Sequence, residues 1–313
     1  MAVLSGKTRI AYGNRAELYD REDNALENLI LKNISILKDK SIMVLNTDKI
    51  LQLPEITDTQ LLGFGLDGYA VASYYGALLK VDVGFIRTES KTHGTKKNVD
   101  GVIDAQKDIC LFVEESKIDF ALLTTKKYGL HIRYVYSFSS EERTLPKSGD
   151  IVLYPEYTLP KCCEENISEY VNYIYSDDGF LLSSGLKSNR YIETLPAANT
   201  YSLINYIIHK YQSFLESFDA FVGIGYGGIF FSVVSAIALS KRFFVFDAAS
   251  TDSHKYHSTG SFLFFDDFIS TGKNLGIANK FFHSDCQNGA IVLYAKENIK
   301  YDLADLRICS IIE

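Results

Sequence analysis

The sequence predicts an α/β protein of two tandem domains, each with a mainly parallel sheet flanked by helices. Three observations lead to this prediction: the length of 313 residues, the alternation of strand-like and helix-like apolar patterns, and an internal repeat. A chain of this length suits two domains of about 150 residues each. Strands that alternate with helices favour a parallel sheet, and ligands of such sheets bind at the carboxyl ends of the strands.

The internal repeat aligns two long segments without a gap. LLGFGLDGYAVASYYGALLKVDVGFI begins at Leu61, and FVGIGYGGIFFSVVSAIALSKRFFVF begins at Phe221. Each segment predicts a strand, a glycine turn, an apolar helix and a second strand. The glycines that coincide are Gly63, Gly65 and Gly68 in the first segment and Gly223, Gly225 and Gly228 in the second.

Two shorter pairs extend the repeat in the same order. LSGKTRIAY from Leu4 is similar to LSSGLKSNRY from Leu182, and CLFVEESKID from Cys110 takes the place of SFLFFDDFISTGK from Ser261. A chance recurrence of common α/β units is the alternative, and three matches in one order favour duplication. We predict domains over residues 1–148 and 168–313 and a connector over 149–167, because TLPKSGDIVLYPEYTLPKCCEEN mixes Pro, Gly and charges there.

Composition limits the class of protein. Hydrophobic residues make up 47% and charged residues 23% of the chain, which predicts packed globular structure throughout. The net charge of −7 argues against broad nucleic-acid binding but not against small anionic ligands. The five cysteines lack CxxC spacing and predict reduced thiols. With no signal-peptide pattern and no apolar stretch long enough for a bilayer, we expect a cytoplasmic protein without a membrane segment.

The strongest chemical motif begins at the apolar strand predicted over residues 262–265. Asp266 and Asp267 end this strand, and a polar turn leads into a helix near Asn274. Two carboxylates can accept hydrogen bonds from the neighbouring hydroxyls of a ribose, and a turn before a helix can hold a phosphate. The residues of this turn are Ser270, Thr271, Gly272 and Lys273. The alternative is an Asp pair that only caps the helix.

The glycine segment GIGYGG, which begins at Gly223, forms a second candidate site element. Its residues Tyr226, Gly227 and Gly228 would present main-chain amides to a phosphate. The spacing of the glycines also fits a dinucleotide-binding motif, in which Asp247 would be the acid that contacts the ribose. The acid pair at Asp266 distinguishes the two interpretations.

A basic loop follows the predicted strand near Phe85. The segment FIRTESKTHGTKKNVDG contains Arg87, Lys91 and His93, whose positive groups suit a pyrophosphate leaving group. An ordinary solvated surface loop is the alternative.

These motifs together resemble the type I phosphoribosyltransferases, and most of all orotate phosphoribosyltransferase. The acids followed by S-T-G resemble the family's phosphoribosyl diphosphate signature, and R-x-E-x-K-x-H-G resembles its mobile catalytic loop. The resemblance implies a small hood on each domain, with Ser183, Ser184, Gly185 and Lys296 near the base. It also implies Mg²⁺ bound indirectly at Asp266 and Asp267, through ribose and pyrophosphate oxygens.

The two halves depart from the family pattern in complementary ways. The first half has Glu114 and Glu115 followed by SKID, so its phosphate turn is lost. The second half has Asp247 opposite Arg87 but keeps Lys255 and His257. We therefore predict a pseudo-dimer in which the loop of the first domain completes one site in the second. Loops that act in their own domains are the alternative.

The resemblance implies an enzyme that uses phosphoribosyl diphosphate and a nucleobase, with orotate as the default acceptor. Departures at Ser183, Gly227 and Lys296 weaken the case for orotate itself, because relatives place Lys, Lys and Arg there. The main alternative is a non-catalytic sensor of phosphoribosyl diphosphate or of a nucleotide, or a regulatory protein of stress or defence on the same fold. A tandem ribose-phosphate pyrophosphokinase is a further one. The partners expected are small molecules, and a homo-oligomer or a protein partner remains open.

Overall fold

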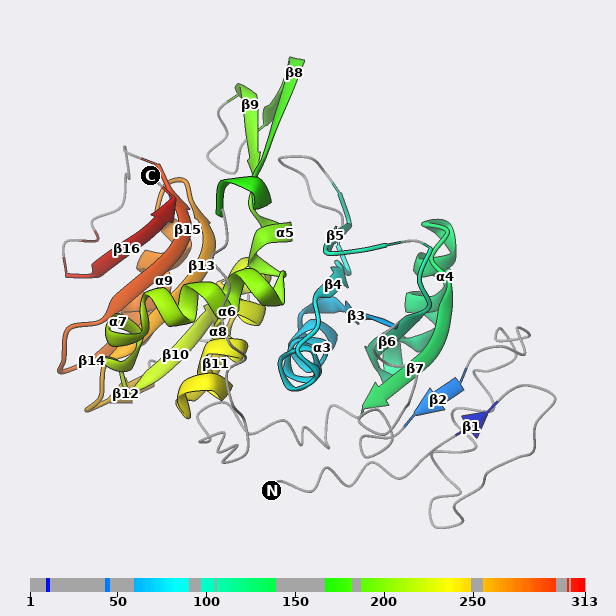
Figure 1. Cartoon of the computed structure of the whole chain (residues 1–313), viewed down its shortest axis with the longest axis horizontal. Helices are drawn as coiled ribbons and strands as arrows, with labels where there is room; N and C mark the ends of the chain where they lie inside the picture. Colours follow the sequence, from blue (N-terminus) through cyan, green and yellow to red (C-terminus); the bar gives the residue numbers. More distant parts are fainter. Residues whose placement is uncertain are drawn as a thin grey trace. The chain divides into compact units, whose positions relative to one another are not determined.

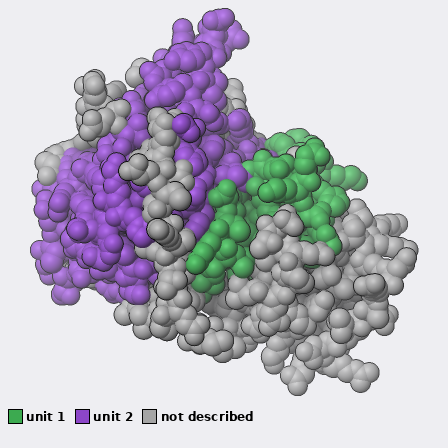
Figure 2. Space-filling view, in the orientation of Figure 1, with its two compact units in different colours: residues 1–88, 103–147 green, residues 89–102, 148–313 purple. Residues whose placement is uncertain are grey.

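The protein forms two compact units, each with its own sheet. The computed structural model describes residues 10–11, 43–45, 59–89, 97–104, 106–138, 167–181, 187–248, 256–296, 303 and 305–312. The first unit comprises Met1–Thr88 and Ile103–Lys147, and the second comprises Glu89–Val102 and Ser148–Glu313 (Figure 2). The segment Glu89–Val102 therefore belongs to the second unit although it lies in the first half of the sequence. The predicted connector falls almost wholly outside the described residues.

The first unit is built on a seven-stranded sheet. Its strands in sheet order are β1 (Ile10–Ala11), β2 (Met43–Leu45), β7 (Ile132–Phe138), β6 (Ile109–Glu114), β3 (Gln60–Phe64), β4 (Val83–Ile86) and β5 (Val99–Gly101). The last of these, β5, lies in the segment Glu89–Val102, which is grouped with the second unit. Strand β3 pairs in parallel with both β4 and β6, and β7 pairs in parallel with β6 and β2. Strand β1 is antiparallel to β2. The sheet is thus mainly parallel, as the sequence predicts.

Two helices cover opposite faces of this sheet, because successive side chains of a strand point to opposite sides. Helix α3 (Gly65–Leu79) lies over Gly63, where the backbone of Tyr69 leaves no room for a side chain. The next residue, Phe64, meets Phe120 of α4 (Ile118–Lys127) edge to face, with ring centroids 5.6 Å apart. A short 3₁₀ turn, η2 (Glu115–Lys117), connects β6 to α4.

The second unit is built on a five-stranded parallel sheet (Figure 1). Its strands in sheet order are β11 (Arg242–Phe246), β10 (Ala220–Ile224), β13 (Phe262–Ile269), β15 (Gly289–Ala295) and β16 (Arg307–Ile312). Two small sheets accompany it: the antiparallel hairpin of β8 (Asn172–Leu181) and β9 (Lys187–Glu193), and the parallel pair of β12 (Tyr256–Ser258) and β14 (Phe282–Ser284). The hairpin projects beyond α5 in Figure 1 and corresponds to the predicted hood strand.

Helices also flank both faces of the second sheet. On one face, Phe231 of α8 (Gly225–Leu239) packs edge to face on Phe265 of β13. On the other face, Phe264 lies beside Phe282, in a core that also contains Leu275 of α9 (Lys273–Phe281). The remaining helical segments are η3 (Ile167–Tyr170), α5 (Leu195–Ala198), α6 (Tyr201–Lys210) and α7 (Gln212–Glu216). Among the described residues, no helix is both long and apolar enough to cross a membrane.

The aligned halves of the sequence occupy matching places in the two sheets. Helices α3 and α8 each follow the central strand of a parallel trio and begin at a glycine in the left-handed region, with φ of 69° at Gly65 and 53° at Gly225. Each helix also ends on a left-handed residue, Lys80 with φ of 60° and Ser240 with φ of 53°. The same turn chemistry therefore enters and leaves both helices.

Candidate functional site

The predicted acid pair lies at the carboxyl edge of the second sheet. Strand β10 pairs with β13 only as far as Gly223 opposite Phe265, so Asp266 and Asp267 begin where that pairing stops. On its other side β13 continues along β15 to Ile269, which corrects the expectation that the acids end the strand. The correction has a tertiary cause, because β15 supplies hydrogen-bonding partners past the acids. The pairing with β10 therefore stops before the acids, whereas the pairing with β15 continues past them.

The two carboxylates of Asp266 and Asp267 are half-buried and close together. The backbone N–H of Asp267 donates to Oδ1 of Asp266 at 2.9 Å. Burial, and then the charge of Asp267, raise the pKa of Asp266 well above its ordinary value. A cation or a hydrogen-bond donor bound beside the pair would favour the ionised form of Asp266. The pair is therefore suited to receive such a ligand.

Gly227 in the first turn of α8 lies directly against the acids. A Cβ atom on Gly227 would lie 2.7 Å from Oδ1 of Asp266 and closer still to Oδ1 of Asp267. The absence of a side chain thus allows the helix N-terminus to approach the carboxylates. The first turn of α8 has no acidic residue, and such helix ends favour anions. Tyr226, beside Gly227, is half-buried.

A second helix N-terminus follows the acids in the chain, shortly after the end of β13. Gly272 has a φ of 80° and caps α9, which begins at Lys273, next to the predicted start near Asn274. Ser270 and Thr271 are half-buried, whereas Lys273 is exposed. Helix N-termini of this kind bind phosphate through backbone N–H groups. The predicted phosphate turn therefore has a geometry that suits an anion.

The other predicted residues are only partly described. The guanidinium carbon of Arg87, which follows β4, lies 5.0 Å from the centroid of the Phe85 ring. Lys296 follows β15, and its Nζ lies 5.9 Å from the centroid of the Phe268 ring. His257 lies in β12, but its side chain is outside the described part. The predicted residues that lie wholly outside it are Lys91, His93, Ser183, Ser184, Gly185 and Lys255.

No sequence pattern indicated Thr194, which contacts the acids, or its neighbour Glu193, which pairs with a lysine of the predicted basic loop. Thr194 donates its hydroxyl hydrogen to Oδ2 of Asp267 at 2.5 Å, across 73 residues of sequence. Its neighbour Glu193 accepts a hydrogen bond from Nζ of Lys97 at 2.7 Å. No spacing rule connects positions so far apart, so the sequence carried no signal for these contacts.

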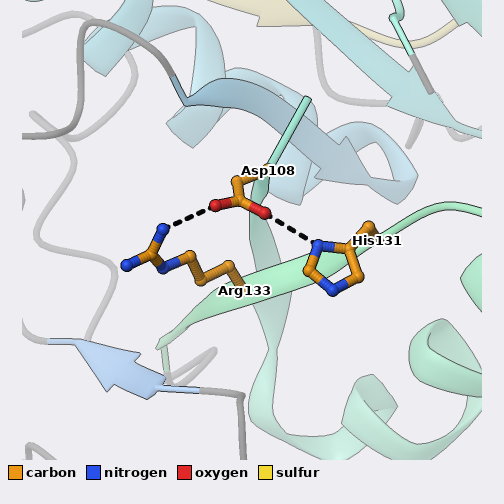
Figure 3. Close-up of polar contacts among 3 residues, drawn as sticks. All are labelled: Asp108, His131 and Arg133. Atoms are coloured by element: carbon orange, nitrogen blue, oxygen red, sulfur yellow. Dashed lines mark hydrogen bonds and ion pairs between the residues drawn. The ribbon is translucent and has the colours of Figure 1, made fainter. Parts of the chain in front are cut away.

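A separate polar cluster in the first unit has the features of a structural contact. Asp108 accepts hydrogen bonds from Arg133 at 2.6 Å and shares one with His131 at 2.7 Å (Figure 3). The hydrogen bond from Arg133 is the main cause that lowers the pKa of Asp108. These residues lie at the amino ends of β6 and β7, away from the carboxyl ends where ligands of parallel sheets bind. We therefore do not assign a functional site to this cluster.

The described residues do not form a complete metal cage. Among them no group of three or more His, Cys, Asp or Glu side chains could hold a metal ion. Mg²⁺ commonly binds to one or two carboxylates and completes its coordination with phosphate oxygens and water. The acid pair alone would not complete the coordination of Mg²⁺, so an ion at this edge would need the oxygens of a phosphorylated ligand.

The fold and the carboxyl edge of the second sheet define an α/β protein with an acid pair at that edge. The pair lies against the N-terminus of α8 and precedes the N-terminus of α9 in the chain. No family model matches the sequence, and the search of curated proteins found no match. Similar solved structures include an orotate phosphoribosyltransferase from Aeropyrum pernix, which is 18% identical, covers 45% of this chain and 87% of its own, and has a TM-score of 0.36. An adenine phosphoribosyltransferase from Saccharomyces cerevisiae is 14% identical, covers 47% and 96%, and has a TM-score of 0.36. The UMP synthase of Leishmania donovani is 12% identical, covers 94% and 75%, and has a TM-score of 0.34.

Proposed function

We propose that the protein is a Mg²⁺-dependent phosphoribosyltransferase that uses 5-phosphoribosyl 1-diphosphate and a nucleobase to give a nucleotide and pyrophosphate. The observation that carries this proposal is the position of Gly227 against the carboxylates of Asp266 and Asp267. It brings an anion-binding helix end next to two hydrogen-bond acceptors. A ribose that carries vicinal hydroxyls and a diphosphate matches this combination.

Each part of the substrate has a proposed partner. Asp266 and Asp267 accept hydrogen bonds from the 2- and 3-hydroxyls of the ribose. The turn of Ser270 to Lys273 holds the 5-phosphate, and the amides of Tyr226, Gly227 and Gly228 hold the pyrophosphate. Mg²⁺, when bound, would neutralise charge on the pyrophosphate while the bond between the pyrophosphate and ribose C1 breaks. The resulting sugar has oxocarbenium character, and Lys91 and His93 would stabilise the leaving group electrostatically.

We further propose one composite site, in the second unit. Residues 97–102, which follow Lys91 and His93 in the chain, belong to the second unit, which supports this assignment. The first unit has Asp67 in the first turn of α3, where the second unit has Gly227, and a carboxylate there repels a phosphate. In addition, Glu114 forms an ion pair with Lys117 at 2.6 Å, at the turn where the first half lacks S-T-G. These features support a degenerate first unit.

Orotate or a base of similar shape is the proposed acceptor, by resemblance. The hood residues Ser183 to Gly185 and Lys296 would contact the base. Lys296 offers a point charge rather than the planar fork of an arginine, so a base with a single anionic group also fits.

The test is Mg²⁺-dependent release of pyrophosphate from phosphoribosyl diphosphate with orotate and a panel of purine, pyrimidine and nicotinic bases. Release that requires one base and Mg²⁺ is the expected result. Tight binding of phosphoribosyl diphosphate with no release across the panel supports the alternative, a non-catalytic sensor. That alternative has one observation in its favour: position 227 is a glycine, so the lysine that the resemblance implies there is absent, and a side chain added there would meet the carboxylates of Asp266 and Asp267. Absence of both binding and release would overturn the proposal.

A further inference from the structure

Thr194 contacts the acid pair from an element that the proposed substrate contacts do not use. It lies between β9 and α5, and only 2% of its surface is exposed. Its hydroxyl is 2.5 Å from Oδ2 of Asp267. An ionised carboxylate accepts hydrogen bonds only, so the threonine must be the donor. A hydrogen bond to a charged acceptor is stronger than one between neutral groups.

The movement of the other carboxylate oxygen of Asp267, Oδ1, is limited by the backbone of α8. Oδ1 lies so close to Gly227 that a Cβ atom there would overlap it. Rotation of the carboxylate would therefore break the bond to Thr194 or press an oxygen against the α8 backbone. Two contacts, one from each side, restrict the orientation of this acid.

The residues directly before and after Thr194 in the chain are buried and fixed by packing or pairing. After it, Ala197 and Ala198 of α5 are fully buried, and α5 packs on α8 and β13. Before it, Glu193 is 8% exposed and is paired with Lys97. The carbonyl of Thr194 also accepts the N–H of Ala198 at 3.0 Å. The hydroxyl position is thus set by packed backbone rather than by a mobile side chain.

We propose that Thr194 is a positioning residue, which holds the carboxylate of Asp267 in the orientation that accepts the ribose hydroxyls. Thr194 need not touch the ligand, because each carboxylate oxygen has lone pairs for more than one donor. This inference rests on the proposed function for the identity of the ligand, whereas the orientation of Asp267 can be tested without it.

The experiment compares three variants with the unsubstituted protein. Thr194→Val removes the hydroxyl and keeps the shape, and Thr194→Ser keeps the hydroxyl. Thr200→Val is the matched control, because Thr200 donates its hydroxyl hydrogen to the carbonyl of Pro196 at 2.8 Å rather than to an acid. The dissociation constant of phosphoribosyl diphosphate with Mg²⁺ is measured by calorimetry, and crystal structures give the Asp267 orientation.

We expect Thr194→Val to weaken binding about tenfold or more, because it removes a hydrogen bond to a charged group. Thr194→Ser and Thr200→Val should bind as the unsubstituted protein does. Unchanged binding by Thr194→Val, equal weakening by Thr194→Ser, or the same loss in Thr200→Val would each overturn the inference. If the unsubstituted protein binds no phosphoribosyl diphosphate, the proposed function fails. The positioning role is then decided by the structures: Asp267 rotated in Thr194→Val and unmoved in Thr194→Ser supports it, and an unmoved Asp267 in both overturns it.

Discussion

Nζ of Lys97 lies 2.7 Å from Oε1 of Glu193, which links a residue from the basic segment of the first half to the last residue of β9. The lysine side chain is half-exposed, whereas the glutamate side chain is only 10% exposed. A buried carboxylate that loses its cation carries a larger penalty than an exposed one. Loss of the pair is therefore costly mainly because it leaves the buried carboxylate of Glu193 without its cation.

Removing the cation should loosen the strand beside it. In Lys97→Met we expect the amides of β5 to exchange hydrogen about fivefold to tenfold faster, because partial exposure of the lysine limits the pair to about 1 kcal/mol. Exchange read by mass spectrometry checks this. The matched control is Lys117→Met, which breaks the Glu114–Lys117 pair and should leave β5 unchanged. Equal exchange of β5 in all three proteins would contradict the prediction.

Two neighbouring glycines should respond differently to the same added methyl group. A Cβ on Gly228 would overlap the backbone carbonyl of Phe265, which cannot move without distorting β13, so Gly228→Ala should cost about 3 kcal/mol in the free energy of unfolding. A Cβ on Gly227 meets side-chain carboxylates, which move more readily than backbone, although movement of Asp267 breaks its hydrogen bond with Thr194. Gly227→Ala should therefore cost about 1 kcal/mol in stability but weaken phosphoribosyl diphosphate binding at least about tenfold.

Urea denaturation and calorimetry on both glycine variants check these outcomes. Full binding by Gly227→Ala would show that the approach of α8 to the acids is not needed for the ligand.

The two acid pairs of the chain provide a direct comparison. Asp266→Asn and Asp267→Asn should each lower the rate of pyrophosphate release about 10- to 100-fold, because each removes one or more hydrogen bonds to a charged acceptor. Glu114→Gln and Glu115→Gln, in the first unit, should leave that rate unchanged. A loss of activity in the glutamate variants would argue for a working site in the first unit and against a single composite site.

The Asp108 cluster predicts a pH-dependent contribution to stability. The hydrogen bond from Arg133 lowers the folded pKa of Asp108 below the ordinary value of 3.8. A lowered folded pKa contributes stability that is fully present above the ordinary value and is lost as pH falls through the folded value. Because the partners are exposed, we expect about 0.5 kcal/mol, or about 1 °C in Tm, between wild type and Asp108→Asn at pH 7.

That Tm difference should close when the melting experiment is repeated at low pH. A difference that grows as pH falls would have the wrong sign for an aspartate with a lowered pKa.

Much of the fold followed from local pattern. Gly225 and Gly272 have φ values of 53° and 80°, which residues with a side chain rarely adopt. Their positions in the sequence therefore marked the starts of α8 and α9. The acid pair was visible because apolar strand residues lead directly into it. The extent of β13 was not visible, because its last residues are held by pairing with β15 far along the chain. Local patterns do not contain that information.

The sequence by itself determined the two α/β halves, the glycines of the turns, and the acids Asp266 and Asp267, since each depends on residues near one another in the chain. Only the tertiary structure decided which groups meet those acids. Thr194 reaches Asp267 across 73 residues, and Lys97 reaches Glu193 across 96. Such contacts arise when packed elements bring distant segments together, because buried polar groups need partners and the fold, not the spacing, supplies them.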